Sequence, residues 1–475
     1  MSEELTYGRR DFFSQMSGSL AGVALASLLA RGQSLSAATV PGEAADRPPH
    51  HRPKAKRVIH IFLSGGLSQV DTFDHKPALE KLHGQPLPSS AQPEVFFGKV
   101  GLLHQSHWRF APRGKCGLEI SELFPHLATC ADQLTVVRSM VASSGNHAPA
   151  IYEANSGFPL MGFPMMGAWL SYGLGCETDE LPTFVVLPDP RGLPTGGPVN
   201  WTSGFLSARH QGVAFRGRGE AIADLRSPRP ISEQQRLARF ALLEEMNRDH
   251  LAAHGASDPL SARIQAYEMA ARMQTAVPNV LDLARETAET HALYGLDDPS
   301  CAAFGRTALT ARRLLEHGVR FVQLWSGDGP KWDSHTDVPA DHAREARLID
   351  RPIAGLLRDL RRRGLLDDTL VIFSSEFGRT PFAQSASGTL GKGRDHNQTA
   401  YSIWLAGAGL KPGFAYGATD EFGHRVAEHP VSIHDFHATL LHLLGIDHKR
   451  LTFYHNGIQR RLTNVSGEVV RDILI

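Results

Sequence analysis

Acidic and imidazole side chains recur in this chain close to the ends of stretches that are typical of buried strands. They are Asp71, His147, Asp333, His335, Glu376 and His396. In an α/β sheet, the loops beyond the carboxyl ends of several strands converge on one crevice, and ligands collect there. Unpaired carboxylates buried in such a crevice would each cost roughly several kcal/mol, so a cluster of them requires a cation. We therefore predict one pocket in which these residues surround one or two divalent ions.

The ligand types narrow the choice of ion. Imidazole nitrogens mixed with carboxylates suit Zn²⁺, whereas Mg²⁺ or Ca²⁺ fits better where oxygen ligands dominate. Asp71 follows a Gly65-Gly66 turn, where backbone amides can approach an anion while the carboxylate holds a cation. The alternative for this stretch is a tight turn that Asp74 caps.

A second stretch whose residues could take part in catalysis or ligand binding runs from Ser143 to Pro149. There a strand-like run opens into a polar turn before a helical pattern. The start of a helix offers free backbone N–H groups, and a side chain beside them can act as a nucleophile or as a ligand. His147 is the candidate for that role. The alternative is that Asn146 or His147 only caps the helix.

Apolar runs that predict buried strands alternate with helical patterns along the chain. The strands are expected at residues 57–63, 134–140, 183–187, 319–325 and 369–375. Between the last two, apolar residues from Ile349 to Leu360 recur at spacings of three and four, which predicts a long helix. This alternation is typical of an α/β/α sandwich with a mainly parallel sheet.

Further helices are predicted outside this central pattern. A short helix capped by Ser121 is expected over residues 121–130, and another over residues 150–155, which would stop at Ser156-Gly157. Residues 232–315 are rich in Ala, Leu, Glu and Arg and poor in Gly, which indicates an inserted or flanking helical layer.

The charge balance excludes partners that are recruited by a global electrostatic field. The 475 residues carry 49 Lys and Arg against 49 Asp and Glu, and 42% of them are hydrophobic. Such a chain is globular and has no overall basic character for binding nucleic acid. Its four cysteines lack the CxxC spacing of a zinc knot, and Cys116 and Cys130 would either pair across a short loop or remain free thiols.

The first residues carry a targeting pattern. Arg9-Arg10 precedes a mildly apolar run from Leu20 to Ala30, and small residues at 36–38 offer a cleavage site. The pattern predicts a twin-arginine signal peptide at residues 1–38 and a polar, Pro-rich linker at residues 39–56. The apolar run is shorter than the roughly 20 residues that span a membrane. We therefore expect a periplasmic or otherwise exported protein whose mature form has no membrane span.

Several stretches resemble the sulfatase and alkaline phosphatase superfamily. Residues 349–378 are similar to its helix and following strand that deliver a metal-binding Asp-His pair, and residues 432–446 are similar to its C-terminal segment. Within the superfamily, the chain resembles an exported bacterial sulfatase-like family of uncharacterised function. Motifs of that family occur here in order at Phe62–Asp74, Trp332–His335, Ser375–Pro381 and Gly393–His396. The resemblance implies an alkaline-phosphatase-like α/β/α sandwich over residues 57–475.

The resemblance also implies roles for the metal-capable residues. Glu376 stands where the superfamily has its metal-binding Asp, and Phe377 replaces the paired His. His396 matches a later metal-binding His. In the superfamily, a second metal ion is bound by an Asp and a His. His335 together with Asp333 or Asp328 resembles that pair. The Asp of the first strand is replaced by Gly65-Gly66, and Asp71 is the candidate substitute.

The same resemblance leaves the nucleophile open. His147 stands at the position of the superfamily's nucleophilic Cys or Ser, and Ser144 lies three residues earlier. Three alternatives follow. Ser144 could reach into the site as the nucleophile, a metal-bound water could attack the ester directly, or the site could bind a metal without catalysis. Arg379 and Arg394 flank the site, and their forked donors suit a tetrahedral oxyanion. The alternative for both is carboxylate pairing that holds loops.

The function that the resemblance implies is metal-dependent hydrolysis of a sulfate or phosphate ester. The substrate would be a small-molecule or polysaccharide ester in the exported compartment. The alternative is a catalytically degenerate sulfatase-like binding protein of the cell envelope, which Phe377 and the missing nucleophile favour. The sequence leaves open the number of ions, the choice between sulfate and phosphate, and the oligomeric state.

Overall fold

The computed structural model describes residues 48–88, 93, 95–216, 221–222, 232–255 and 258–475. The predicted signal peptide at residues 1–38 lies outside this range and stays a prediction. The chain divides into two compact units, a smaller one formed by Met1–Glu43 and Arg229–Ile264 and a larger one formed by Ala44–Pro228 and Gln265–Ile475. All candidate site residues belong to the larger unit.

The described part of the smaller unit consists of α5 (Glu233–His254) and the beginning of α6 (Asp258–Leu281). At the start of α5, the Ser232 hydroxyl accepts the N–H of Gln235, and the Gln235 side chain accepts the N–H of Ser232. This reciprocal pair satisfies donors that the first turn of a helix leaves without partners. Helical structure thus begins where the composition of residues 232–315 predicts it.

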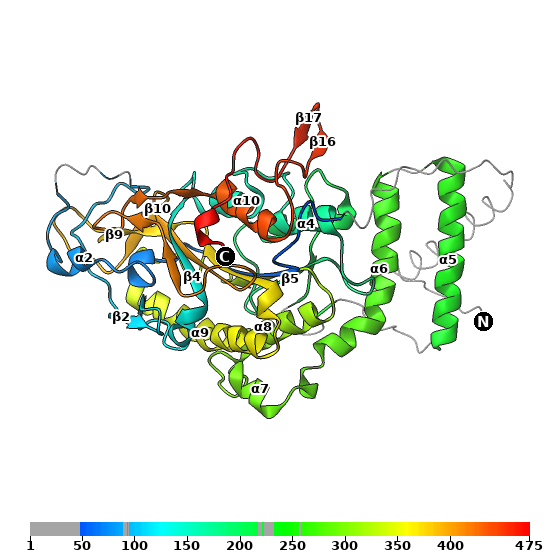
Figure 1. Ribbon diagram of the computed structural model, residues 1–475, viewed down its shortest axis with the longest axis horizontal. Coiled ribbons are helices and arrows are strands. Elements are labelled where there is room, and N and C mark those ends of the chain that lie inside the picture. Colours follow the sequence, from blue (N-terminus) through cyan, green and yellow to red (C-terminus); the bar gives the residue numbers. More distant parts are fainter. Residues whose placement is uncertain (1–47, 89–92, 94, 217–220, 223–231, 256–257) are drawn as a thin grey trace, which may run out of the picture. The chain divides into compact units, whose positions relative to one another are not determined.

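A mixed, mainly parallel sheet forms the centre of the larger unit (Figure 1). Its strands are β1 (Arg57–Leu63), β4 (Leu134–Val141), β5 (Phe184–Leu187), β6 (Val213–Ala214), β7 (Phe321–Ser326), β8 (Thr369–Ser375), β11 (Tyr401–Ala406), β12 (Phe414–Tyr416) and β15 (Val431–Ser432). Their order is β12-β4-β11-β8-β1-β7-β5-β6, and β15 pairs with β4. Of these strands, β11 alone is antiparallel to its neighbours.

The structure confirms the predicted strand runs. Residues 57–63 and 369–375 are β1 and β8, which pair in parallel with Arg57 opposite Thr369 and Leu63 opposite Ser375. The other predicted runs correspond to β4, β5 and β7, with ends that differ by no more than two residues. The predicted α/β fold class with a mainly parallel sheet is therefore confirmed.

Helices cover both faces of the sheet. They are α3 (His147–Ser156), α4 (Met166–Leu174), α8 (Ala302–Glu316), α9 (Val338–Arg362) and α10 (Ile433–Leu443). The helix expected around residues 349–360 is α9, which begins earlier because the Asp337 side chain accepts the N–H of Ala340. Within the described residues, no helix combines the length and the apolar character needed to cross a membrane.

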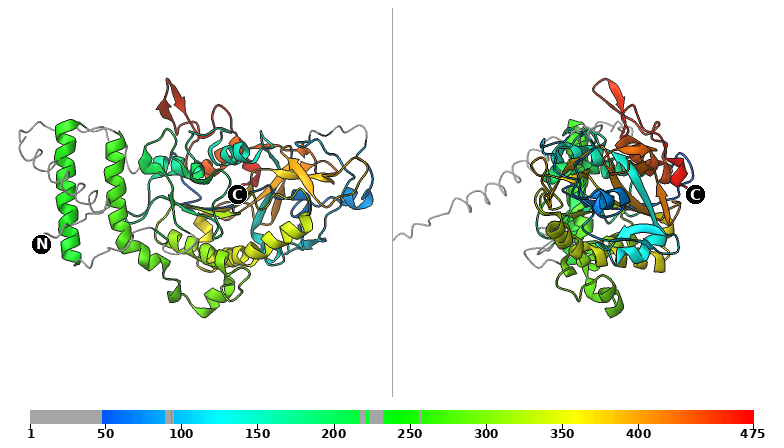
Figure 2. Two further views of the ribbon diagram at one scale, coloured as in Figure 1. Left: turned by 180° about the vertical axis from the view of Figure 1, so that it is seen from behind. Right: turned by 90° about the vertical axis from the view of Figure 1, so that its left-hand side faces the viewer.

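The side chains of β1 alternate between two hydrophobic cores. Ile59 and Ile61 pack into one core together with α8 and α9. Val58 and Phe62 pack into the other core together with α3, α4 and α10. This period of two follows from the pleat of a strand that is covered on both faces. Figures 1 and 2 show the resulting layers, with α8 and α9 on one side of the sheet and α4 and α10 on the other.

The helix predicted at residues 121–130 is not formed, and that prediction was wrong. Leu118–Ser121 is instead strand β3, and a 3-10 helix begins later, at Leu127–Gln133. Pro125 disfavours a helical conformation in the residue before it. In addition, the Asp350 carboxylate on α9 accepts the backbone N–H groups of residues 126 and 127, each at 2.8 Å. A tertiary contact, which the local sequence does not show, therefore sets the start of this helix.

Two other sequence interpretations can be compared with the structure. The described end of the predicted linker is held by backbone hydrogen bonds from His51 to Gly445 and from Lys54 to Leu443, at 3.1 and 2.8 Å. The cysteines are free thiols, with Cys116 exposed and Cys130 buried. The structure therefore supports the free-thiol alternative and not the disulfide.

Candidate metal centre

Separate segments supply the side chains of the candidate metal centre. Strands β4, β8, β1 and β7 are parallel to one another, so their carboxyl ends lie at one edge of the sheet. His147 begins α3 after β4, Glu376 follows β8, and Asp333 and His335 lie on the loop after β7. His396 comes from a hairpin of β9 (Gly378–Ala383) and β10 (Arg394–Asn397). The topology thus gathers residues that are far apart in the sequence.

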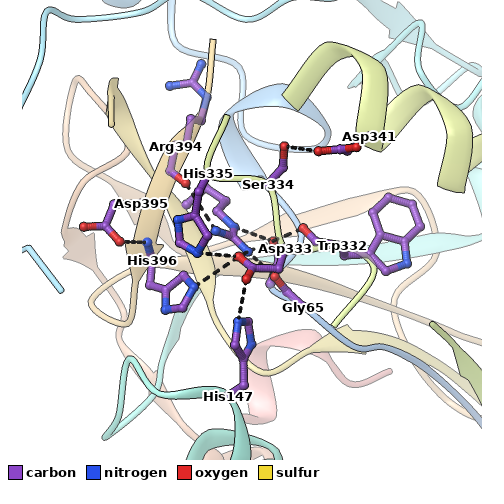
Figure 3. Close-up of polar contacts among 12 residues, drawn as sticks. Gly65, His147, Trp332, Asp333, Ser334, His335, Asp341, Arg394, Asp395 and His396 are labelled. Carbon is purple, nitrogen blue, oxygen red and sulfur yellow. Dashed lines mark hydrogen bonds and ion pairs between the residues drawn. The ribbon is translucent and has the colours of Figure 1, made fainter. Parts of the chain in front are cut away.

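Three histidines converge on the carboxylate of Asp333 through their Nε2 atoms (Figure 3). His335 Nε2 lies 2.8 Å and His396 Nε2 lies 3.2 Å from Asp333 Oδ1. His147 Nε2 lies 3.2 Å from Asp333 Oδ2. Ligand atoms of His147, Asp333 and His396 all lie within 4.8 Å of one another. This spacing is compatible with one ion between them, because the ligand atoms of Zn²⁺ each lie about 2 Å from the metal.

A protein acceptor holds the opposite ring nitrogen of each histidine. The contacts are His147 Nδ1 to Glu376 Oε1 at 2.7 Å, His396 Nδ1 to the Gly145 carbonyl oxygen at 2.6 Å, and His335 Nδ1 to the side-chain oxygen of Gln384. An acceptor at Nδ1 requires a proton on that nitrogen, which leaves the lone pair on Nε2 of the neutral ring. All three neutral rings would therefore present lone pairs to the same point, as metal-binding histidines do.

Lone pairs that face a carboxylate repel it, so the cluster requires positive charge. Nε2 of His147 is buried and has no hydrogen-bond partner within the described part of the chain, although it is in ion-pair range of Asp333. Burial lowers the pKa of His147, but Asp333 and Glu376 outweigh burial and raise the pKa to about 9. A proton on His147 supplies the required charge, and a divalent cation bound by the cluster would supply it as well.

Asp333 and His396 have pKa values that suit metal ligands. Burial raises the pKa of Asp333, but the three histidines and Arg379 outweigh it and hold the pKa well below its ordinary value. Burial lowers the pKa of His396. At neutral pH Asp333 is therefore ionised and His396 is neutral, which are the forms that bind a metal.

Glu376 lies behind His147 rather than in the centre of the cluster. Its Oε1 accepts the backbone N–H of Gly65 at 2.8 Å in addition to its contact with His147. Its Oε2 accepts the Ser375 hydroxyl at 3.0 Å. The sequence predicts Glu376 as a ligand, whereas these contacts describe a residue that positions a ligand.

Gly65 allows the loops after β1 and β7 to touch. Its φ is 128°, and a Cβ at this position would lie 2.4 Å from the backbone nitrogen of Asp333. Only glycine combines this backbone conformation with so close an approach. The Gly-Gly turn therefore brings the Asp333 loop against the segment that holds Glu376.

Arg379 and Arg394 hold loops together. Both guanidinium groups are buried. Arg379 donates to the Asp333 carboxylate at 2.6 Å and to backbone carbonyl oxygens that include those of Gly65 and Gly66. Arg394 donates to the Asp71 carboxylate at 2.8 Å and to carbonyl oxygens of the neighbouring loops. These contacts are those of the loop-holding alternative, and the oxyanion clamp stays a prediction.

The structure does not bring Asp71 into the cluster. Its Oδ2 accepts Ser68 Oγ at 2.5 Å as well as Arg394, and its Oδ1 accepts the N–H of His107 at 3.2 Å. Ser144 is also separate, because its hydroxyl accepts the N–H of Asn146 at 3.1 Å and makes no hydrogen bond to the cluster among the described residues. The predicted ligand role of Asp71 and the predicted nucleophilic role of Ser144 thus have no support from their contacts.

Sequence reasoning missed several residues that build the site. Gln384 and the carbonyl of Gly145 orient two of the histidines. Phe96 and Phe97 pack beside His396, with ring centroids 5.1 and 5.7 Å from its own. Gln384 lies one residue beyond β9, so its place after a recognised motif was the available signal. Nothing in the irregular segment around Phe96 marks it in the sequence.

Comparisons with known proteins identify a family and distant structural likenesses. Residues 55–474 match the family described as "Protein of unknown function (DUF1501)". None of the curated proteins compared matches the chain. Phosphonate monoester hydrolase SpPMH from Silicibacter pomeroyi is 12% identical, with 88% of this chain and 76% of that chain covered and a TM-score of 0.37.

Two further solved structures show a similar degree of likeness. The PsFucS1 sulfatase from Pseudoalteromonas sp. is 12% identical, with 82% of this chain and 68% of that chain covered and a TM-score of 0.34. The alkaline phosphatase from the Antarctic bacterium TAB5 is 9% identical, with 79% of this chain and 96% of that chain covered and a TM-score of 0.33. Likeness at this level does not identify an activity.

Proposed function

The chain belongs to the DUF1501 family, and we propose that it is a metal-dependent hydrolase of sulfate or phosphate esters. The observation that carries the proposal is the convergence of three histidines on Asp333, each held through Nδ1 by a protein acceptor. The choice of ester rests on the motifs that resemble the sulfatase and alkaline phosphatase superfamily.

The donor set favours a transition metal such as Zn²⁺ over Mg²⁺ or Ca²⁺. Three imidazole nitrogens and one carboxylate suit Zn²⁺, whereas Mg²⁺ and Ca²⁺ prefer sites built from oxygen. His147, Asp333, His335 and His396 would hold one ion. Asp71 and Glu376 are engaged elsewhere, so these contacts give no second set of ligands. We therefore propose a centre with one ion.

Water is the proposed nucleophile. A divalent ion at this centre would lower the pKa of a water molecule and offset the negative charge that develops on the ester oxygens. The chain itself fixes the direction of each imidazole, and Arg379 fixes the Asp333 carboxylate by a contact of 2.6 Å. Because Ser144 is bound to Asn146, we favour direct attack by water over a covalent intermediate on Ser144.

The second candidate is a metal-binding protein of the cell envelope that catalyses nothing. The observation that favours it is the internal engagement of Arg379 and Arg394, which leaves neither guanidinium group directed to an oxyanion. Phe377 is also fully buried at the position where the superfamily has a ligand. Turnover measurements separate this candidate from the hydrolase.

Metal content and ester turnover test the proposal together. We expect the purified chain to contain close to one equivalent of Zn²⁺ or a related transition metal. We also expect it to hydrolyse an aryl sulfate or an aryl phosphate. Asp333→Ala and His335→Ala should each lose most of the bound metal, because both side chains belong to the proposed ligand set. Each should also lower the turnover rate at least about 100-fold.

The matched control is His126→Ala, because His126 is an exposed histidine that takes no part in the contacts of the cluster. This variant should keep its metal and its turnover. A chain that binds metal but hydrolyses neither ester would establish the envelope-protein alternative. A chain without metal, whose Asp333→Ala variant turns over normally, would reject the centre altogether.

A further inference from the structure

A pocket of about 250 Å³ lies beside the candidate metal centre. Its lining among the described residues consists of Val95, Phe96, Gly145, His396, Asn397, Gln398 and Thr399. His396 belongs to both sites, because it lines the pocket and its Nε2 lies 3.2 Å from Asp333. A molecule in the pocket would therefore lie next to a histidine of the centre at which we place the reaction.

An aromatic surface forms one wall of the pocket. The ring of Phe96 stacks on the ring of His396, with centroids 5.1 Å apart and an angle of 29° between the planes. Phe96 and the adjacent Phe97 keep 48% and 52% of their surfaces exposed. Paired aromatic side chains that stay half exposed beside a pocket indicate a surface that binds a ligand.

A buried carboxylate fixes this wall. Asp395 Oδ2 accepts the backbone N–H of Phe97 at 2.8 Å, and Asp395 Oδ1 accepts the N–H of His396 at 2.7 Å. Asp395 is fully buried. One side chain thus positions both the aromatic wall and a histidine of the candidate metal centre.

Apart from Val95 and Gly145, the rest of the described lining is formed by the uncharged polar residues Asn397, Gln398 and Thr399. It contains no Asp, Glu, Lys or Arg. Asn397 and Thr399 bind each other and the carbonyl oxygen of His424. The side-chain amide of Gln398 makes no hydrogen bond within the part of the chain that the structure describes. This amide is available to donate to and accept from a ligand.

We propose that the pocket binds the alcohol portion of the substrate as an uncharged pyranose sugar, which stacks on Phe96 and hydrogen-bonds to Gln398. The inference rests on the proposed function, since it names the group whose ester bond would lie at the candidate metal centre.

A sugar ring matches both the aromatic and the polar part of the lining. One face of the ring is made of C–H groups that an aromatic side chain can cover, and its edge carries hydroxyl groups that an amide can bind. A charged ring would find no side chain of opposite sign among the described lining. A purely aliphatic group would leave the Gln398 amide without a partner, which costs free energy.

Binding of uncharged sugars tests the inference without any turnover. The probes are the methyl glycosides of glucose, galactose, mannose and N-acetylglucosamine, added to the full zinc-loaded chain and followed by saturation-transfer NMR. We expect at least one of them to bind. Phe96→Ala should weaken that binding about fivefold to tenfold, and Gln398→Ala should weaken it about threefold to tenfold.

Two variants make the test specific. Phe96→Tyr keeps the aromatic face and should bind as the wild type does. Tyr454→Ala removes an aromatic side chain that is 65% exposed and does not line the pocket, so it should also leave binding unchanged. Unaltered thermal unfolding of each variant shows that the fold is retained.

The pocket assignment and the proposed function fail in different ways. The assignment is overturned if no glycoside binds, if Phe96→Ala binds as tightly as the wild type, or if adenosine binds in preference to every sugar. Glycoside binding without aryl ester turnover would support the pocket and reject the hydrolase. Turnover without glycoside binding would reject the pocket and support the hydrolase.

Discussion

Glu376 acts on the candidate metal centre through His147. Its Oε1 accepts the ring N–H at 2.7 Å, and the N–H of Gly65 holds the same oxygen at 2.8 Å. A carboxylate behind a metal-binding histidine fixes the ring and makes the opposite nitrogen more basic. The charge of Glu376 therefore contributes to metal affinity without a bond to the ion.

Glu376→Gln should weaken Zn²⁺ binding about 10- to 100-fold, because the amide keeps the shape of the side chain but removes the negative charge. Competition with a chromogenic chelator measures the affinity. Glu428→Gln is the control, since Glu428 is exposed and takes no part in the contacts of the cluster. Equal affinities of the wild type and Glu376→Gln would contradict the positioning role.

Asp71 stabilises the loop after β1 through Arg394. Burial raises the pKa of Asp71, but Arg394 and His107 outweigh burial and lower the pKa to about 2. Since the folded pKa lies below the unfolded value, the contribution of Asp71 to stability is complete above about pH 4 and falls as the pH drops toward 2. Loss of one partner of a buried ion pair costs about 3 to 5 kcal/mol.

Asp71→Asn should therefore lower the free energy of unfolding by about 3 to 5 kcal/mol at pH 7. The difference from the wild type should shrink by about 1 kcal/mol at pH 3, where the carboxylate contributes less. Urea unfolding at the two pH values measures both effects. Asp328→Asn is the control, because Asp328 is exposed. A difference that does not change with pH would refute the ion-pair account.

Residue types could be predicted more reliably than residue partners. His147, Asp333, His335 and His396 were expected at one pocket because they follow or flank strand ends, and the structure brings them together. The partners of Asp71, Arg379 and Arg394 could not be predicted, because a buried charge pairs with whichever loop the tertiary fold places beside it. The order of residues along the chain does not show which loops lie side by side in the fold.

At the scale of elements, glycines set how closely the loops of the site approach. A Cβ at Gly65 would collide with the backbone of residues 332 and 333. A Cβ at Gly393 would lie 1.8 Å from the carbonyl oxygen of His335. The strand ends bring the loops to one edge, and these two glycines let the loops close on it.

Gly65→Ala should lower metal affinity at least about tenfold, because the loop that carries Asp333 must move away from the added methyl group. It should also cost more than the roughly 1 kcal/mol of backbone strain alone. Gly364→Ala isolates that strain, since Gly364 has a φ of 69° and no atom within 4 Å of its Cβ position. Chelator competition and urea unfolding would show whether the two variants differ. Identical behaviour of both would exclude the collision.

Elements were predictable wherever local pattern decided the structure. Continuous apolar runs identified β1 and β8, because strands covered on both faces contain few polar residues. The error at residues 121–130 arose where a distant carboxylate on α9 holds the backbone of residues 126 and 127. The aromatic wall at Phe96 and Phe97 was missed for a similar reason, since Asp395 fixes it from nearly 300 residues away.

At the scale of the whole molecule, we propose export through the twin-arginine route, on the basis of Arg9, Arg10 and the apolar run after them. Replacing both arginines with lysine should abolish export, because this route reads the arginine pair rather than the positive charge. Cell fractionation and immunoblotting measure the exported fraction. Arg31→Lys lies outside the pair and should leave export unchanged. Undiminished export of the double variant would disprove the assignment.

The position of β1 in the sheet has a consequence for how the chain is made. β1 is the first sheet strand to leave the ribosome, yet its partners β7 and β8 begin only at Phe321 and Thr369. At roughly 5 to 20 residues per second, translation leaves this apolar strand unpaired for tens of seconds. Unpaired apolar strands aggregate readily. We therefore expect the nascent chain to need a chaperone that shields β1 until translation has passed Ser375.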